Sequence, residues 1–327
     1  MYEIKCPIDA HLHLRQGDEL KEITQYSECN EYSVLMPNTI PAIIDLKSLE
    51  NYKQQVSTVC KKQIPLYTLK LTPWTKNIEQ LVGKIIGIKL YPIGATTNSD
   101  QGVNLGGIEG HFGQFEEMEE FGIPLMGHWE DPLVPSMDRE IACLDIIDKI
   151  IRHFPKLKIV FEHVSCRQSV DYIKENPQMR GSITLHHLLC TYDDLLGNHL
   201  QPHMFCKPII KSERDREALL DVALSAHPKF FYGSDSAYHP WERKLKGAAG
   251  VFSAPVALSL LFELFYKNNL LFKLEDFISE NASQFYNLTP TGRRIKLIQE
   301  KWKVPEMISG TVPLYAGQTI SWRTMND

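Results

Sequence analysis

The chain has 327 residues, of which 43% are hydrophobic and 23% charged, an ordinary globular composition that argues against a disordered, collagen-like or coiled-coil protein. Its 35 Lys and Arg and 40 Asp and Glu give a formal net charge of −5, which offers no electrostatic footprint for nucleic acid or an anionic membrane surface. The length fits roughly two domains of about 150 residues, or one α/β barrel of about 250 residues with an extension.

The chain shows no sequence signal for export or for a membrane span. The N-terminal residues lack the basic segment and apolar run of a signal peptide, and no stretch approaches about 18 uninterrupted apolar residues. The seven Cys residues form no Cys-x-x-Cys pair, which argues against a disulfide framework and against a thiolate zinc site. We therefore expect a cytoplasmic protein with reduced thiols.

Short β-rich runs alternate with longer helix-like runs along the chain. The expected strands are 4–14, 32–38, 64–71, 85–91, 123–128, 157–163, 181–185 and 229–234, and the expected helices are 46–62, 113–121, 138–153, 167–175, 213–226 and 254–266. Apolar strands joined by helical crossovers predict an α/β fold, a parallel (β/α)8 TIM barrel. We expect residues 1–327 to form a single domain, in which residues 290–327 are a C-terminal extension packed on the barrel.

A barrel places its functional residues at the C-terminal ends of its strands, and polar side chains recur at these positions. His11 and His13 are two residues apart, so in a strand both imidazoles point to one face and can reach one metal ion. Later strands end at His128 and His163, and the last runs into Asp235. A lone His at a strand end is more often structural, but this coincidence on one rim favours a hydrolytic zinc or similar divalent site.

Lys89 lies in an apolar expected strand, where an unpaired ammonium would cost several kcal/mol to bury. Two interpretations remain open. The side chain either snorkels to the barrel mouth, or it has reacted with carbon dioxide. The resulting carbamate is an anion whose two oxygens can bridge two cations.

Several short motifs in the chain match one known family. They are His11-Leu-His13-Leu-Arg15, Met36-Pro-Asn38, Lys89-Leu-Tyr-Pro with Ala95-Thr-Thr-Asn98, Phe161-Glu-His163 and Gly233-Ser-Asp235-Ser-Ala-Tyr-His239. Together they resemble dihydroorotase, in its shorter, stand-alone bacterial type within the amidohydrolase superfamily. The resemblance runs from about Asp9 to the C-terminus, and the Arg, Asn and Ala-Thr-Thr-Asn elements are more specific than His-x-His alone.

The resemblance implies a pair of zinc ions in each subunit, bridged by a hydroxide. One ion would be held by His11, His13, Asp235 and a carbamylated Lys89 (N6-carboxylysine), and the other by Lys89, His128 and His163. The carbamate would derive from CO₂. The resemblance also implies that the hydroxide is the nucleophile and that Asp235 is the general acid and base.

The same resemblance implies the substrate and its binding residues. The reaction would be the reversible cyclisation of N-carbamoyl-L-aspartate to L-dihydroorotate in pyrimidine biosynthesis, carried out by a homodimer. Arg15, Asn38, His239 and Ala249 would bind substrate, and a flexible loop with Thr96 and Thr97 would close over it. A planar guanidinium with amide and imidazole donors suits a carboxylate. The alternative for the loop is an ordinary threonine turn.

The chain departs from the family pattern at positions that border the expected substrate pocket. Tyr238 replaces the proline of Ser-Ala-Pro-His, Gly127-His-Trp-Glu replaces the more common His-Gly-Glu, and Lys207 replaces an apolar residue. These changes concern loop details and substrate affinity more than the reaction.

Other histidines receive no catalytic role from the sequence. His186 and His187 follow the seventh expected strand and could touch the pocket, but we expect a structural or solvent role for them. His203 fits the family pattern, and we have no mechanistic account of it.

Two further functions are compatible with a metal-binding barrel. One is another cyclic amide hydrolase, such as an allantoinase or a hydantoinase, although Arg15 with Asn38 argues for a substrate that bears a free carboxylate. The other is an inactive binding subunit, although such a protein would be expected to lose metal ligands, and this chain retains all of them.

Overall fold

The main sheet has nine parallel strands in the order β10-β2-β3-β4-β5-β6-β7-β8-β9. The computed structural model describes residues 1–325, and its strands in this sheet are β2 Ile8–His13, β3 Tyr32–Leu35, β4 Ile64–Lys70, β5 Gly87–Leu90, β6 Leu125–Gly127, β7 Ile159–Phe161, β8 Met179–Ile183, β9 Phe230–Tyr232 and β10 Ser236–Ala237. Strand β10 follows β9 almost directly and pairs with β2. The sheet therefore closes, and the predicted (β/α)8 barrel is confirmed.

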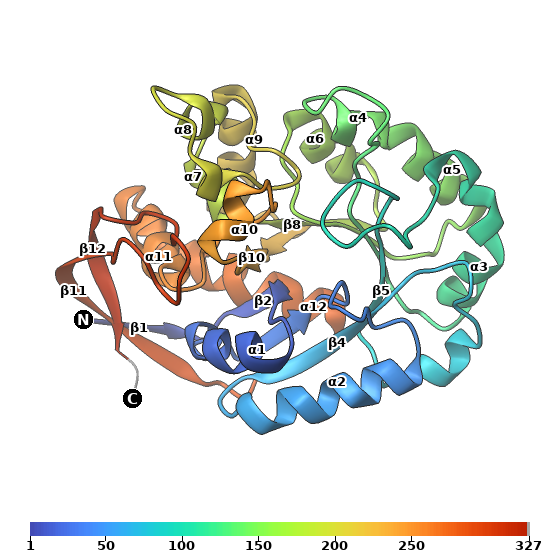
Figure 1. Ribbon diagram of the computed structural model, residues 1–327, viewed down its shortest axis with the longest axis horizontal. Helices are drawn as coiled ribbons and strands as arrows, with labels where there is room; N and C mark the ends of the chain where they lie inside the picture. The colour runs from blue at the N-terminus through green and yellow to red at the C-terminus, as the bar shows by residue number, and fades with distance from the viewer. Residues whose placement is uncertain (326–327) are drawn as a thin grey trace.

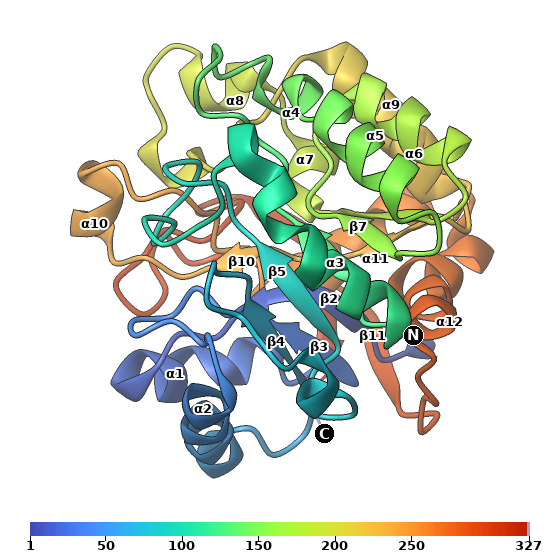
Figure 2. The same ribbon diagram turned by 90° about the vertical axis from the view of Figure 1, so that its right-hand side faces the viewer.

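The helices are α1 Gly17–Ile23, α2 Leu46–Val59, α3 Phe112–Glu120, α4 Arg139–Ala142, α5 Leu144–His153, α6 Arg167–Glu175, α7 Leu185–Leu189, α8 Tyr192–Leu196, α9 Glu213–Leu224, α10 Trp241–Leu245, α11 Ala257–Lys267 and α12 Asn281–Tyr286. Helices α3, α5, α6 and α9 lie side by side outside the strands (Figure 2). Within residues 1–325, no helix is long and apolar enough to cross a membrane.

Local sequence explains where several helices begin. Asp45 caps α2 by accepting a hydrogen bond from the Ser48 N–H at 2.7 Å, and Ser212 caps α9 in the same way. The expected helix 138–153 is instead two helices, α4 and α5, which meet at Cys143.

One end of the barrel is closed by packing. Apolar side chains from strands around the barrel, among them Ile8, Val34 and Val160, form a buried cluster with Ala282 and Tyr286 of α12. Because Ile8 begins its strand, α12 covers the end of the barrel where the strands start. The carboxyl ends of the strands lie at the other end, which is where the site is expected.

A second, antiparallel sheet contains β1 Tyr2–Lys5, β11 Arg294–Lys303 and β12 Thr319–Met325 in the order β1-β11-β12. It lies to one side of the barrel, beside the N-terminus (Figure 1), and β12 packs on α11. The expectation of one strand over 4–14 is therefore wrong. The chain leaves this sheet after Lys5 and enters the barrel at Ile8, and Pro7 between them has no N–H for a strand ladder.

Candidate active site

The carboxyl ends of the barrel strands line one pocket, called here the barrel-mouth pocket. The residues expected from the sequence that line it are His11, His13, Arg15, Asn38, Thr96, Thr97, His128, His163, Asp235, His239 and Ala249. Tyr91 and Lys207 also line it. Lys89 is the one expected residue that does not. Its side chain is fully buried, and its Nζ lies 5.3 Å from the centre of the Tyr91 ring.

Closure of the barrel brings three of the expected metal ligands together. His11 and His13 lie on β2, and their Nε2 atoms are 3.4 and 2.9 Å from the same Asp235 oxygen. Asp235 lies between β9 and β10, where its N–H donates to the His11 carbonyl at 2.8 Å. Its φ of 43° is unusual for a residue other than glycine, so the backbone holds this carboxylate in a strained position.

His128 and His163 form a second pair of facing imidazoles. Nδ1 of His128 is 3.1 Å from Nε2 of His163, and the other His163 nitrogen has no hydrogen-bond partner within residues 1–325. Burial, followed by the neighbouring His128, lowers the pKa of His163 well below its ordinary value. Burial likewise lowers the pKa of His128. Two neutral imidazoles with converging nitrogens are suited to share a cation.

Buried carboxylates, which were not predicted from the sequence, form hydrogen bonds to the outer nitrogens of these imidazoles. Glu162 accepts hydrogen bonds from His11 Nδ1–H at 2.8 Å and from the Ser182 hydroxyl at 2.5 Å. Glu130 accepts one from His128 Nε2–H at 2.8 Å. These bonds leave the other nitrogen of each ring free to bind a metal ion. The sequence does carry a signal for these two residues. Each is an acidic residue within two positions of an expected metal ligand, in Phe161-Glu-His163 and in Gly127-His-Trp-Glu.

Lys89 does not snorkel. Its side chain is 0% exposed, and its Nζ has no hydrogen-bond partner in the described part of the chain. Burial lowers the pKa of Lys89 to about 8, although Glu162 and Asp235 act in the opposite direction. A sizeable fraction of this lysine is therefore a neutral amine near pH 8.

Arg15 and His239 place a guanidinium and an imidazole in the same pocket as the expected metal ligands. Arg15 Nε and Nη2 donate to the Tyr238 carbonyl at 3.0 and 2.8 Å, which fixes the plane of the guanidinium. His239 Nε2 lies 3.0 Å from Arg15 Nη2 and 2.9 Å from the Ala249 carbonyl. Since this nitrogen either accepts or donates, only one of the two contacts is a hydrogen bond at a time.

The segment with Thr96 and Thr97 is held by its neighbours. The Ser99 hydroxyl donates to the Thr96 carbonyl at 2.6 Å, and the Asn98 side chain donates to the Asn38 carbonyl at 3.1 Å. The segment thus reaches the loop that carries Asn38, so both threonines face the barrel-mouth pocket.

Lys244 of α10, a residue with no role predicted from the sequence, joins two loops of the pocket wall. Its buried ammonium donates to the carbonyls of Phe205, Ala248 and Gly250 at 2.8, 2.9 and 2.6 Å. The pocket residue Lys207 lies two positions after Phe205, and the pocket residue Ala249 lies between Ala248 and Gly250. The lysine therefore fixes both segments relative to each other.

Comparisons with known proteins agree with this site. No protein-family model matches the chain. A dihydroorotase of Helicobacter hepaticus is 40% identical over 334 residues, which cover 98% of this chain and 97% of that protein. The crystal structure of a Campylobacter jejuni dihydroorotase matches with a TM-score of 0.92 at 38% identity, covering 99% and 97% of the two chains. A Saccharomyces cerevisiae dihydroorotase in complex with 5-fluoroorotic acid matches with a TM-score of 0.92 at 29% identity, covering 99% of each.

The barrel, with histidines and an aspartate gathered at its mouth, defines a cyclic amide hydrolase of the amidohydrolase superfamily. The similarity to the Helicobacter and Campylobacter proteins extends over nearly the whole chain and is far higher than a shared fold requires. The chain belongs to the dihydroorotase family. This membership favours dihydroorotase over the allantoinase, hydantoinase and inactive-subunit alternatives.

Proposed function

We propose that this enzyme interconverts N-carbamoyl-L-aspartate and L-dihydroorotate with two zinc ions in the barrel-mouth pocket. The observation that carries the proposal is the meeting of two imidazole clusters with a fixed guanidinium in one pocket. The imidazoles supply metal ligands, and the guanidinium suits the carboxylate that both substrates carry.

The side chains fit a pair of divalent ions. His11, His13 and Asp235 offer ligand atoms within 4.8 Å of one another, and His128 and His163 offer converging nitrogens. One ion would be held by the first three and by a carbamate on Lys89, and the other by this carbamate with His128 and His163. Bound there, the ions would lower the pKa of a water molecule and polarise the substrate carbonyl.

A carbamate on Lys89 resolves the problem of its burial. The ammonium first loses one proton, the resulting neutral amine adds to CO₂ with formation of a C–N bond, and a second proton leaves. A cation without a hydrogen-bond partner in the described residues thereby becomes an anion. The fully buried Nζ without a hydrogen-bond partner in residues 1–325, and the pKa lowered to about 8 by burial, support this proposal.

Arg15, Asn38, His239 and Ala249 would bind the α-carboxylate side of the substrate. The guanidinium has five N–H donors, so donors beyond those given to Tyr238 are available for a carboxylate. Thr96 and Thr97 would add hydroxyl donors from a loop that closes over the substrate.

Asp235 would move the proton. Burial alone would raise its pKa, but the imidazoles of His11 and His13 lower it overall, so the carboxylate is ionised. In hydrolysis it accepts a proton from the attacking water and returns it to the ring nitrogen as the amide C–N bond breaks. In ring closure the same oxygen accepts the ureido N–H proton and passes it to the departing oxygen, which takes a second proton from solvent and leaves as water.

We also propose a single domain over residues 1–327, with 290–327 as its C-terminal extension, and a homodimer that works in the cytoplasm. The resemblance to the stand-alone bacterial type supports these assignments. Light scattering that gave the mass of one chain at working concentration would contradict the dimer.

Turnover of three substrates tests the reaction itself. The zinc-loaded enzyme is expected to hydrolyse L-dihydroorotate, and to hydrolyse hydantoin and allantoin at least about 100-fold more slowly, because neither carries a carboxylate for Arg15. Equal or faster turnover of hydantoin or allantoin would contradict the proposal.

A further inference from the structure

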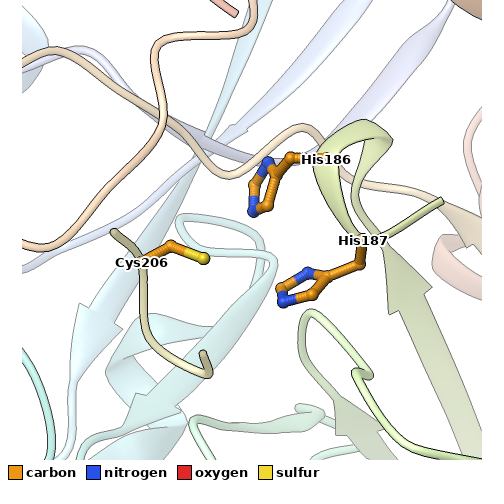
Figure 3. A group of neighbouring side chains, drawn as sticks. All are labelled: His186, His187 and Cys206. Atoms are coloured by element: carbon orange, nitrogen blue, oxygen red, sulfur yellow. The ribbon is translucent and has the colours of Figure 1, made fainter. Parts of the chain in front are cut away.

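A second group of metal-ligating side chains lies between α7 and the segment 205–208. His186 and His187 are on α7, and Cys206 reaches them from that segment. Their ligand atoms all lie within 4.8 Å of one another, and the three side chains point toward a common centre (Figure 3). None of the three belongs to the residues proposed to hold the catalytic metal pair.

The imidazole of His186 is buried without hydrogen bonds to the described residues. Its side chain is 0% exposed, and both ring nitrogens are without a hydrogen-bond partner among residues 1–325. A neutral imidazole always has one donor and one acceptor, so this burial costs free energy that a bound ligand would recover. Sequence analysis expected a structural or solvent role for His186 and His187, and their burial excludes the solvent role.

The side chains of His187 and Cys206 are both held by the Pro208 carbonyl. The Pro208 carbonyl accepts hydrogen bonds from His187 Nε2–H at 3.1 Å and from the Cys206 thiol at 3.2 Å. The remaining His187 nitrogen contacts the Thr184 hydroxyl at 2.8 Å. Metal binding would replace one hydrogen bond at His187, and the thiol hydrogen bond of Cys206, with bonds to the cation.

We propose that His186, His187 and Cys206 bind one transition-metal ion of the zinc class, separate from the catalytic pair. Two imidazoles and a thiolate select such ions, whereas Mg²⁺ and Ca²⁺ need oxygen ligands. A water molecule or the Pro208 carbonyl would complete a tetrahedral site. The ion replaces the thiol proton, which leaves to solvent, so affinity rises with pH.

The ionisation of the two imidazoles agrees with this site. Burial lowers the pKa of His186 to about 4 and that of His187 to about 3, so both are neutral at pH 7 and need lose no proton. Only Cys206, whose thiol pKa is raised by burial, must be deprotonated by the ion.

Such an ion would stiffen a wall of the barrel-mouth pocket. Cys206 lies between Phe205, whose carbonyl accepts from Lys244, and Lys207, which lines the pocket. A metal bond at Cys206 would therefore tie this wall to α7, which follows β8 of the barrel.

Cobalt spectroscopy tests the site without reference to activity. Protein stripped of metal with a chelator is titrated with Co²⁺, and thiolate coordination is detected by its sulfur-to-cobalt charge-transfer band. The proposed catalytic ligands include no Cys, so the band cannot come from the catalytic pair. We expect the band to saturate at one thiolate-bound Co²⁺ per chain, and inductively coupled plasma analysis to find three metal ions per chain.

Single substitutions test whether the charge-transfer band arises from a metal ion bound to Cys206. Cys206→Ser is expected to abolish it, and His186→Gln to weaken Co²⁺ binding by about tenfold or more. Cys143→Ser, at another fully buried cysteine, is expected to leave the band unchanged. Wild-type protein with no band at saturating Co²⁺, or a band that survives in Cys206→Ser, would overturn the inference. An active enzyme with two metal ions and no band would do so while leaving the proposed function intact.

Discussion

At the scale of single residues, the site depends on pairs that hold a functional side chain in one orientation. Glu162 holds His11, Glu130 holds His128, and the Tyr238 carbonyl holds Arg15. Most of the side chains that line the pocket could be predicted, the histidines and Asp235 from their positions at strand ends and the others from the family resemblance. Their supports could not, since Glu162 contacts a residue 151 positions away and only the fold shows that contact.

Replacing Glu162 with Gln removes the charge behind His11 and keeps the size of the side chain. We expect a loss of about 10- to 100-fold in metal affinity or in kcat/KM, because the carboxylate raises the basicity of the imidazole and fixes its tautomer. Metal titration measures the affinity, and steady-state kinetics measure kcat/KM. Glu116→Gln, on the exposed face of α3, is the control, and equal behaviour of the two variants would contradict the assignment.

Arg15→Lys tests whether geometry matters beyond charge. A lysine keeps the cation but cannot donate twice to Tyr238 and also present a planar pair of donors to a carboxylate. We expect kcat/KM for L-dihydroorotate to fall about 10- to 100-fold. Arg152→Lys, on an exposed helix, should show wild-type kinetics. Wild-type kinetics for Arg15→Lys would refute the role of the guanidinium.

At the scale of elements, the strands and helices were predictable where hydrophobic periodicity is long, and their breaks were not. The expected strand 4–14 divides between two sheets at Cys6 and Pro7. The last expected strand, 229–234, contains only β9, and the chain breaks at Asp235 before the unpredicted strand β10. Both breaks depend on partners from distant parts of the chain, β11 for the first and β2 for the second. The loops that complete the pocket are tied by such contacts too, above all by Lys244.

Lys244→Met removes the donor shared by three carbonyls while keeping a long apolar side chain. The hydrogen bond to Gly250 is buried, and those to Phe205 and Ala248 are part-buried. The buried carbonyl left without a partner costs about 1 to 3 kcal/mol and the other two cost less, so we expect the free energy of unfolding to fall by about 2 to 3 kcal/mol. We also expect KM to rise, because Ala249 lies in the loop that is released. Urea unfolding and kinetics measure both effects. The control is Lys246→Met, at an exposed lysine two positions further along the chain. Equal stability of the two variants would contradict a stabilising role for the Lys244 hydrogen bonds.

At the scale of the whole molecule, all seven cysteines lie within the described residues and none is in a disulfide. Burial raises the pKa of Cys29 and of Cys190 to about 12, and that of Cys143 well above its ordinary value. Folded thiols therefore keep their protons at a pH where unfolded thiols lose them. Their contribution to stability is complete below about pH 9 and is lost as pH rises toward their folded pKa values.

Cys143→Ala isolates one such thiol. Between pH 8 and pH 10 the wild-type protein should lose about 1.4 kcal/mol more unfolding free energy than the variant, since one ionisation of the unfolded state is removed. Urea unfolding under reducing conditions at several pH values measures the difference. Val170→Ala, in the same core, should lower stability equally at every pH. A pH slope for Cys143→Ala identical to that of wild type would show that this thiol ionises in the folded protein.

The central claim is that Lys89 is converted to an anion that joins two metal ions at the barrel mouth. A high-resolution crystal structure of the enzyme prepared with zinc and bicarbonate tests it most directly, using anomalous scattering to place the zinc. We expect carbamate density on Lys89 between two zinc peaks, one beside His11, His13 and Asp235 and the other beside His128 and His163. A bare Lys89 side chain beside a fully occupied zinc site would contradict it.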